Sequence, residues 1–322
     1  MKSGLLALLA AALLPAAAAA QTSTADISPR TELHAIPTMT VSDSDFLAGK
    51  DGKAATVAGQ LRIAQGTGKL PVVILMHGSG GMGAQLDTWS RLFNSMGVST
   101  FAIDGFTGRG LTSVNMDQAQ LGRLNFILDI YGALAILAKH PRVDPQRIVL
   151  MGFSRGGQAA LYASLTRFHK MWNKSGASFA AYIPFYPDCS TSYIDDTDVA
   201  AAPIRIFHGI ADDYNPLSSC KAFLTRLKSA GRDVELTEYA DAQHGFDSPL
   251  GAVAVAKGAQ TVRACTIKEG PAGVLVNTAT GSPFAYTDTC VQLDPQVGRN
   301  AAAAAAAQTA VSDFVRTLFK LK

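Results

Sequence analysis

Residues 148–158 read Ile-Val-Leu-Met-Gly-Phe-Ser-Arg-Gly-Gly-Gln, and this stretch decides the fold that we expect. Its first four residues form a short apolar run, which is typical of a strand buried on both faces of a parallel sheet. The GxSxG motif at 152–156 then opens a helical pattern that continues to Arg167. A serine in this context stands at a sharp, strained turn that needs small residues on both sides, so Ser154 is a candidate nucleophile. The alternative is a glycine-rich turn with an incidental serine.

Strand and helix patterns alternate along the rest of the chain. Short apolar runs predict further buried strands, and an alternating run predicts a strand nearer the edge. Such alternation predicts a doubly wound, mostly parallel α/β sheet flanked by helices. The predicted strands are 72–76, 101–103, 148–151, 180–183, 204–207 and 234–239, and the predicted helices are 86–96, about 118–138, 156–167, 218–230 and about 299–319.

Two segments depart from this alternation. Residues 21 to about 45 are polar and contain two prolines, which predicts an extended lead-in before the sheet. Residues 248–298 contain glycine, proline, threonine and two cysteines without helical periodicity, which predicts an insertion of short strands or loops. We expect this insertion to form one wall of the pocket around Ser154 and the segment 104–114 to form another.

The composition excludes several classes of protein. The 322 residues are 48% hydrophobic, which is normal for a globular protein and excludes disorder for the bulk of the chain. The net charge is only +3 and no basic cluster is present, so no nucleic acid partner is expected.

The first residues resemble an export signal. Residues 1–20 combine a basic start, an apolar stretch and small residues, so we expect a signal peptide that is cleaved after Ala20. An uncleaved anchor is the alternative. No later segment has about 18 uninterrupted apolar residues, so no membrane span is expected after cleavage. The mature chain is therefore expected to be periplasmic or secreted.

Export makes the four cysteines candidates for disulfide bonds. Cys189, Cys220, Cys265 and Cys290 form no CxxC pair, so no metal site is expected from them. Of the three possible pairings, we favour Cys189 with Cys220 and Cys265 with Cys290, because each joins neighbours in sequence and closes a short loop. Free buried thiols are the alternative.

A nucleophilic serine needs a general base. Among the six histidines, His244 is the best placed, because it lies in a loop after the strand predicted at 234–239. His77 and His208 each end a buried strand and precede a glycine, where imidazole nitrogens usually make structural hydrogen bonds. His244 is therefore the candidate base, and a surface histidine is the alternative.

The base in turn needs an acid that orients it. Asp212 and Asp213 both follow the strand predicted at 204–207. We favour Asp212, because it lies closer to the end of the strand and leaves Asp213 to bond the turn before Pro216.

The oxyanion that forms on attack needs two fixed donors. One is expected to be the backbone N–H of Arg155, the residue after the nucleophile. The other is expected from the glycine-rich loop 77–81, and we assign it to Ser79 with Gly80 close behind. This loop lacks the Lys-Ser/Thr ending of a phosphate-binding loop, so phosphate binding is not favoured.

Four motifs follow one another along the chain. They are His77-Gly-Ser-Gly-Gly, Gly152-Phe-Ser-Arg-Gly-Gly, His208-Gly-Ile-Ala-Asp212 and His244-Gly-Phe-Asp247. In this order they resemble the dienelactone hydrolase family of α/β hydrolases, over most of the chain from about residue 50 onward. The resemblance implies a single α/β-hydrolase domain over residues 21–322, a triad of Ser154, Asp212 and His244, and neither a metal nor an organic cofactor. The enzymes that gave the family its name use cysteine where this chain has Ser154, so dienelactone itself is not the expected substrate.

The leading interpretation is a serine hydrolase that cleaves a small-molecule carboxylic ester or lactone through an acyl-enzyme. The same triad also serves thioesterases, peptidases and acyltransferases, and a catalytically silent binding protein is the alternative from another class. Arg109 and Arg155 are candidates to bind a carboxylate on the substrate, although arginines at such positions are as often structural.

Overall fold

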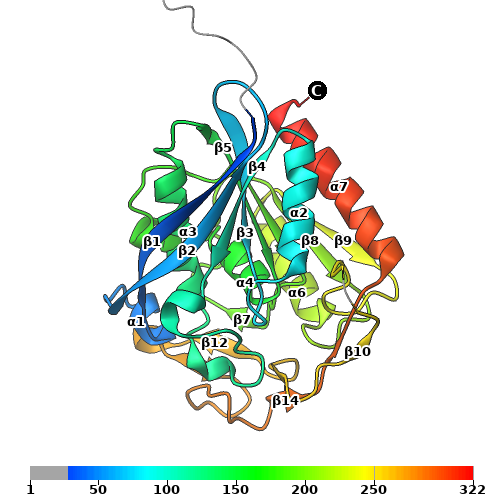
Figure 1. Cartoon of the computed structure of the whole chain (residues 1–322). Coiled ribbons are helices and arrows are strands. Elements are labelled where there is room, and N and C mark those ends of the chain that lie inside the picture. The colour runs from blue at the N-terminus through cyan, green and yellow to red at the C-terminus, as the bar shows by residue number, and fades with distance from the viewer. Residues whose placement is uncertain (1–27, 250, 322) are drawn as a thin grey trace, which may run out of the picture.

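The computed structural model describes residues 28–249 and 251–321. An eight-stranded sheet forms the centre of the molecule (Figure 1). The strands β4, β3, β5, β6, β8 and β9 run parallel to one another, whereas β2 is antiparallel to both of its neighbours, β1 and β4. The expected mostly parallel α/β sheet is therefore confirmed. In sheet order the strands are β1 (Arg30–Thr40), β2 (Lys53–Ile63), β4 (Ser99–Asp104), β3 (Leu70–Met76), β5 (Val143–Phe153), β6 (Ala181–Phe185), β8 (Ile204–Gly209) and β9 (Val234–Tyr239).

Helices cover both faces of the sheet, each with its own apolar core. Apolar residues of α2 (Ala84–Ser95) and α7 (Ala301–Phe319) pack on one face, where the two helices lie side by side (Figure 1). Those of α3 (Asn125–Leu137), α4 (Arg155–Tyr162) and α6 (Leu217–Ser229) pack on the other. The strands between these layers are buried on both sides, which explains their continuous apolar runs. Two shorter helices are α1 (Asp43–Leu47) and α5 (Thr166–Trp172).

The described part of the N-terminal segment, from residue 28 onward, enters the sheet, contrary to the lead-in predicted for residues 21 to about 45. Residues 30–40 form β1, which pairs along its whole length with β2. Ile36 is the one fully buried residue of β1, and the other residues of the strand are exposed or partly buried, so β1 is an edge strand with little buried apolar surface. Its weak pattern explains why the sequence did not reveal it. The predicted signal peptide, residues 1–20, lies outside the described residues.

The segment between β9 and α7 consists of short strands and loops, in the manner predicted for the insertion. The disulfide Cys265–Cys290 closes it, and a second disulfide joins Cys189 to Cys220. These are the two pairings favoured from the sequence. No helix in the described part of the chain is both long and apolar enough to span a bilayer. The small strands are β7 (Thr191–Ser192), β10 (Ala254–Val255), β11 (Gln260–Thr261), β12 (Ile267–Glu269), β13 (Leu275–Asn277), β14 (Gln292–Leu293) and β15 (Gln296–Val297).

Arg109 is a structural residue, so the expectation that it binds substrate is wrong. It ends the short helix η1 (Thr107–Arg109), and its guanidinium donates to both carboxylate oxygens of Asp129 on α3, at 2.7 and 2.8 Å. Further donors reach the carbonyls of Gly105 and Met39 and the hydroxyl of Thr40. The side chain is only 4% exposed, and that of Asp129 is not exposed at all. All its donors are thus engaged in tying β1 and η1 to α3.

Removal of this guanidinium leaves the buried Asp129 without a cation. We expect Arg109→Met to lower the free energy of unfolding by about 3–5 kcal/mol, measured by urea denaturation. The matched control is Arg91→Met, because Arg91 is 69% exposed and pairs with Asp87 at the surface, and its loss should stay below about 1 kcal/mol. Equal losses in the two variants would contradict the assignment of Arg109.

Candidate active site

Ser154 lies at the sharp turn that joins β5 to α4. Its backbone has φ 56° and ψ −117°, a strained conformation for a residue with a side chain. A Cβ atom at Gly156 would lie 2.2 Å from the Met76 carbonyl oxygen, and one at Gly152 would lie 2.0 Å from the carbonyl oxygen of Gly156. Only glycine therefore allows β3, β5 and α4 to approach closely enough to present Ser154.

The predicted base and acid lie beside this serine. His244 Nε2 is 2.8 Å from the hydroxyl oxygen of Ser154, and His244 Nδ1 is 2.8 Å from Asp212 Oδ2. Because Asp212 is a carboxylate acceptor, Nδ1 carries the proton and Nε2 is free to accept the serine proton. Asp212 and His244 are buried, whereas Ser154 is partly accessible.

The two adjacent aspartates have different tasks. Asp212 Oδ1 accepts the backbone N–H groups of Tyr214 and Asn215, both at 2.9 Å, so Asp212 itself bonds the turn that was expected to engage Asp213. Asp213 instead pairs with Arg263 at 3.0 Å. Asp212 thus accepts three hydrogen bonds, two from backbone N–H groups and one from His244, and these fix the orientation of its carboxylate.

The loop 77–81 lies against Ser154. A Cβ atom at Gly78 would be 3.1 Å from the Ser154 Cβ. His77 Nδ1 donates to the Gly78 carbonyl at 2.7 Å, and its Nε2 accepts the N–H of Gly105 at 3.1 Å. Since the peptide is trans, fixing the Gly78 carbonyl also fixes the N–H of Ser79 in the opposite direction.

The second predicted donor comes from the start of α4. Arg155 is the first residue of this helix, so its backbone N–H has no acceptor within the helix. Its guanidinium is buried and donates to Gln118 Oε1 at 2.7 Å and to the carbonyl of Leu121. Both terminal nitrogens of this guanidinium therefore already donate to other groups of the protein, which leaves fewer donors for the expected substrate carboxylate.

Gln118 is a residue that sequence reasoning missed. Its Oε1 accepts a hydrogen bond from the Ser79 hydroxyl at 3.0 Å as well as from Arg155. Its Nε2 donates to the hydroxyl of Tyr214 at 3.3 Å, and its backbone N–H donates to Gln260 Oε1 at 2.8 Å. One amide thus links the two residues whose backbone N–H groups are the candidate oxyanion donors. No motif marks it, because its partners lie far away in sequence.

Aromatic residues fix the position of the His244 ring. The rings of Tyr186 and Tyr214 each have their centroid 4.6 Å from that of His244. The Tyr186 hydroxyl donates to Asp247 at 2.8 Å, and Asp247 also accepts from Trp89 Nε1 at 2.7 Å. Burial raises the pKa of Asp247, and these donors oppose that effect. Since Trp89 lies on α2, the cluster ties the histidine loop to that helix.

The pocket at Ser154 is small and polar. The insertion supplies part of its wall, as predicted, through residues 260–262 and Tyr286. The segment 104–114 was predicted to supply another wall, but the lining residues come from further along the same loop, at Gln118 and Arg123. Arg123 is paired with the buried Asp188. The sequence located the correct loop but not the residues that face the pocket.

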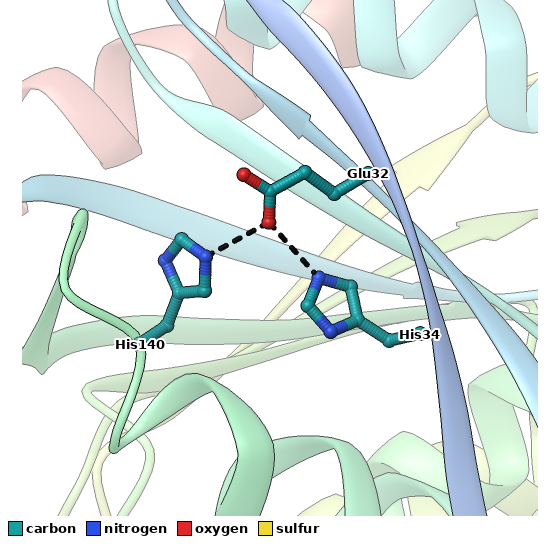
Figure 2. Close-up of side chains that lie close together, drawn as sticks. All are labelled: Glu32, His34 and His140. Carbon is teal, nitrogen blue, oxygen red and sulfur yellow. Dashed lines mark hydrogen bonds and ion pairs between the residues drawn. The ribbon is translucent and has the colours of Figure 1, made fainter.

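One group of three side chains in the described part of the chain has the composition of a metal site. It consists of Glu32, His34 and His140, which point toward one another (Figure 2). Both Nε2 atoms face the same Glu32 oxygen, at 3.2 and 2.9 Å. The Nδ1 of His140 accepts the N–H of Arg142 at 3.2 Å, so in the neutral ring its Nε2 carries the proton and has no lone pair for a metal. The contacts therefore describe a hydrogen-bonded cluster at the opposite end of β5 from Ser154.

Comparison with known proteins gives one family. Residues 57–268 match the model of the dienelactone hydrolase family. A curated protein from Synechocystis sp., named after carboxymethylenebutenolidase, is 24% identical over 222 residues, which are 65% of this chain and 88% of the relative.

Solved structures share the fold. The structure named m3DLH superposes with a TM-score of 0.59 at 18% identity, over 89% of this chain and 98% of the other. A dienelactone hydrolase-like promiscuous phosphotriesterase from metagenomic libraries gives a TM-score of 0.56 at 16% identity, with the same coverage.

Gln118 can be tested as a positioning residue. Gln118→Met removes the shared acceptor of Ser79 and Arg155, so we expect kcat for an activated ester to fall about tenfold while KM changes less. Gln118→Glu keeps an acceptor oxygen and should restore most of the activity. Gln120→Met is the matched control, because Gln120 lies two residues away and is exposed. A fall in stability without a change in kcat would leave Gln118 only a structural role.

His77 makes stability depend on pH. Burial lowers its pKa to about 4, whereas a histidine in the unfolded chain binds a proton near pH 6.5. Unfolding therefore takes up a proton between these values, and the free energy of unfolding falls as the pH is lowered from about 6.5 to 4, by up to about 3 kcal/mol. Urea denaturation over this range should give a smaller decrease for His77→Asn than for the wild type. An equal decrease would show that His77 is not the source.

Proposed function

The chain belongs to the dienelactone hydrolase family, and from this premise we propose that Ser154, His244 and Asp212 are its catalytic triad. The protein is a serine hydrolase of the α/β-hydrolase fold that acts on carboxylic esters or lactones. The observation that carries the assignment of residues is the unbroken pair of 2.8 Å contacts from Ser154 through His244 to Asp212.

The first half of the reaction forms an acyl-enzyme. The Ser154 oxygen attacks the carbonyl carbon of the ester while its proton passes to His244 Nε2. Asp212 holds the ring in the required tautomer and stabilises the imidazolium that forms. The imidazolium then gives its proton to the leaving alkoxide, and the alcohol departs. In a lactone the departing alcohol stays joined to the acyl group.

The second half repeats the same transfers with water. Water attacks the acyl-enzyme carbonyl and loses a proton to His244, which returns that proton to Ser154 as the acid leaves. In both halves the negative charge on the carbonyl oxygen is stabilised by the N–H groups of Ser79 and Arg155. The fixed Gly78 peptide and the position of Arg155 at the start of α4 support these assignments.

The triad does not by itself select the acyl acceptor or the leaving group. Thioester cleavage, peptide cleavage and acyl transfer use the same triad and remain the second candidates. Water is favoured as the acceptor, because the family to which the chain belongs is described as a hydrolase family. A silent binding protein is disfavoured, because Ser154, His244 and Asp212 lie within hydrogen-bonding distance of one another in series.

We also propose one α/β-hydrolase domain over residues 21–322, with an insertion at 248–298, in a periplasmic or secreted protein. The pairing of all four cysteines supports an oxidising compartment. The sheet that extends from β1 to β9 and the return of α7 onto it support a single domain.

The test is hydrolysis of a short-chain p-nitrophenyl ester by the purified protein. Ser154→Ala and His244→Ala should each lower kcat by about 10⁴-fold or more, because the triad acts as a unit. Ser229→Ala, an exposed serine at the end of α6, is the control and should retain activity.

A fluorophosphonate probe provides a second readout. It should label the wild type and not Ser154→Ala. Retained activity in either triad variant, or a wild type that neither hydrolyses an ester nor takes the label, would overturn the proposed mechanism.

A further inference from the structure

A second cavity adjoins the pocket at Ser154, and two residues line both spaces. The space beside the serine is about 30 Å³. The neighbouring cavity is about 400 Å³, within the range of small-molecule sites. Gln118 and Tyr286 line both. Most of an ester bound at Ser154 must therefore lie outside the inner pocket, and this cavity is next to it.

The chemistry of the cavity favours an uncharged ring. Its lining is mainly apolar and includes Leu121, Leu275 and Phe284, with Ser42, Ser44 and Gln118 as uncharged polar residues. None of the described residues that line it is basic. Phe284 and Tyr286 meet edge to face with centroids 5.2 Å apart, an arrangement that a third ring can extend. The one acidic group, Asp43, already accepts the N–H of Leu124 at 3.0 Å, and its charge disfavours an anionic ligand.

The walls of this cavity come largely from outside the segment that matches the family. Residues 42–44 precede the match at 57–268, and residues 274–286 follow it. The N-terminal segment and the disulfide-closed insertion thus build a cavity that the shared family segment does not supply by itself. We therefore expect the ligand specificity of this cavity to depend on these two segments and not only on the segment shared with the family.

We propose that this cavity is a substrate subsite that binds the uncharged, ring-bearing half of an ester or lactone while the reacting carbonyl lies at Ser154. The inference rests on the proposed function and adds the class of substrate to it. Gln118 lines both spaces, and its bonds to Ser79 and Arg155 fix its side chain where they meet. The small inner pocket takes the shorter half of the substrate.

The test compares three esters whose hydrolysis is followed by acid release. They are ethyl acetate, 2-phenylethyl acetate with the ring on the alcohol, and ethyl 3-phenylpropanoate with the ring on the acyl group. We expect kcat/KM for at least one ring-bearing ester to exceed that for ethyl acetate about tenfold or more. The preferred ester shows which half of the substrate enters the cavity.

Filling the cavity should remove this preference. Ala285 is exposed and lines the cavity but not the inner pocket, so Ala285→Trp places a large side chain there. We expect the ratio of kcat/KM between the preferred ring-bearing ester and ethyl acetate to fall about tenfold. Ala306→Trp, on the exposed face of α7, is the matched control and should keep the ratio of the wild type.

A binding measurement separates this inference from the proposed mechanism. Calorimetry with 2-phenylethyl acetate and ethyl 3-phenylpropanoate on Ser154→Ala, with and without Ala285→Trp, reports on the cavity even where no ester is turned over. Loss of binding in the double variant supports the subsite. Equal binding with and without Ala285→Trp, or no preference of the wild type for a ring, would overturn it, whereas failed labelling of Ser154 would count only against the mechanism.

Discussion

The close approach of three backbone segments around Ser154 is the constraint on which the rest of the site depends. The strained turn exists because Gly152 and Gly156 leave no side chain between β5, α4 and the end of β3. This approach places the start of α4 and the loop after β3 beside one serine. A methyl group at either glycine would collide with a carbonyl oxygen, so the chain would have to separate these segments and lose their alignment.

Long-range polar contacts then give the site its shape. Gln118 begins the short helix η2 (Gln118–Gln120) between β4 and α3, yet it joins the loop after β3, the start of α4 and the insertion. Tyr186 and Asp247 similarly connect the histidine loop to α2. Buried polar groups of this kind are costly when they lose a partner, so the loops that carry them are held in one arrangement.

The N-terminal hairpin and the insertion supply cavity walls that lie outside the segment matched to the family. The β1–β2 hairpin is held against α3 by the Arg109–Asp129 pair, and it brings residues 42–44 to the mouth of the site. The insertion packs against this segment, since its short helix at 271–273 contacts α1, and Cys265–Cys290 closes it. In the proposed arrangement, the reacting atoms and the substrate walls come from separate parts of the chain, so the walls can change without a change in the triad.

The sequence by itself determined the sheet, the strained turn and the order of Ser154, Asp212 and His244, because these follow from local apolar runs and from glycines beside a motif. It could not distinguish an arginine that faces the pocket from one that is buried, and Arg109 was misjudged for that reason. Gln118, Tyr186 and the edge strand β1 were also decided by the tertiary structure alone. Their partners lie tens of residues away or more, and only the folded chain brings those atoms within hydrogen-bonding distance.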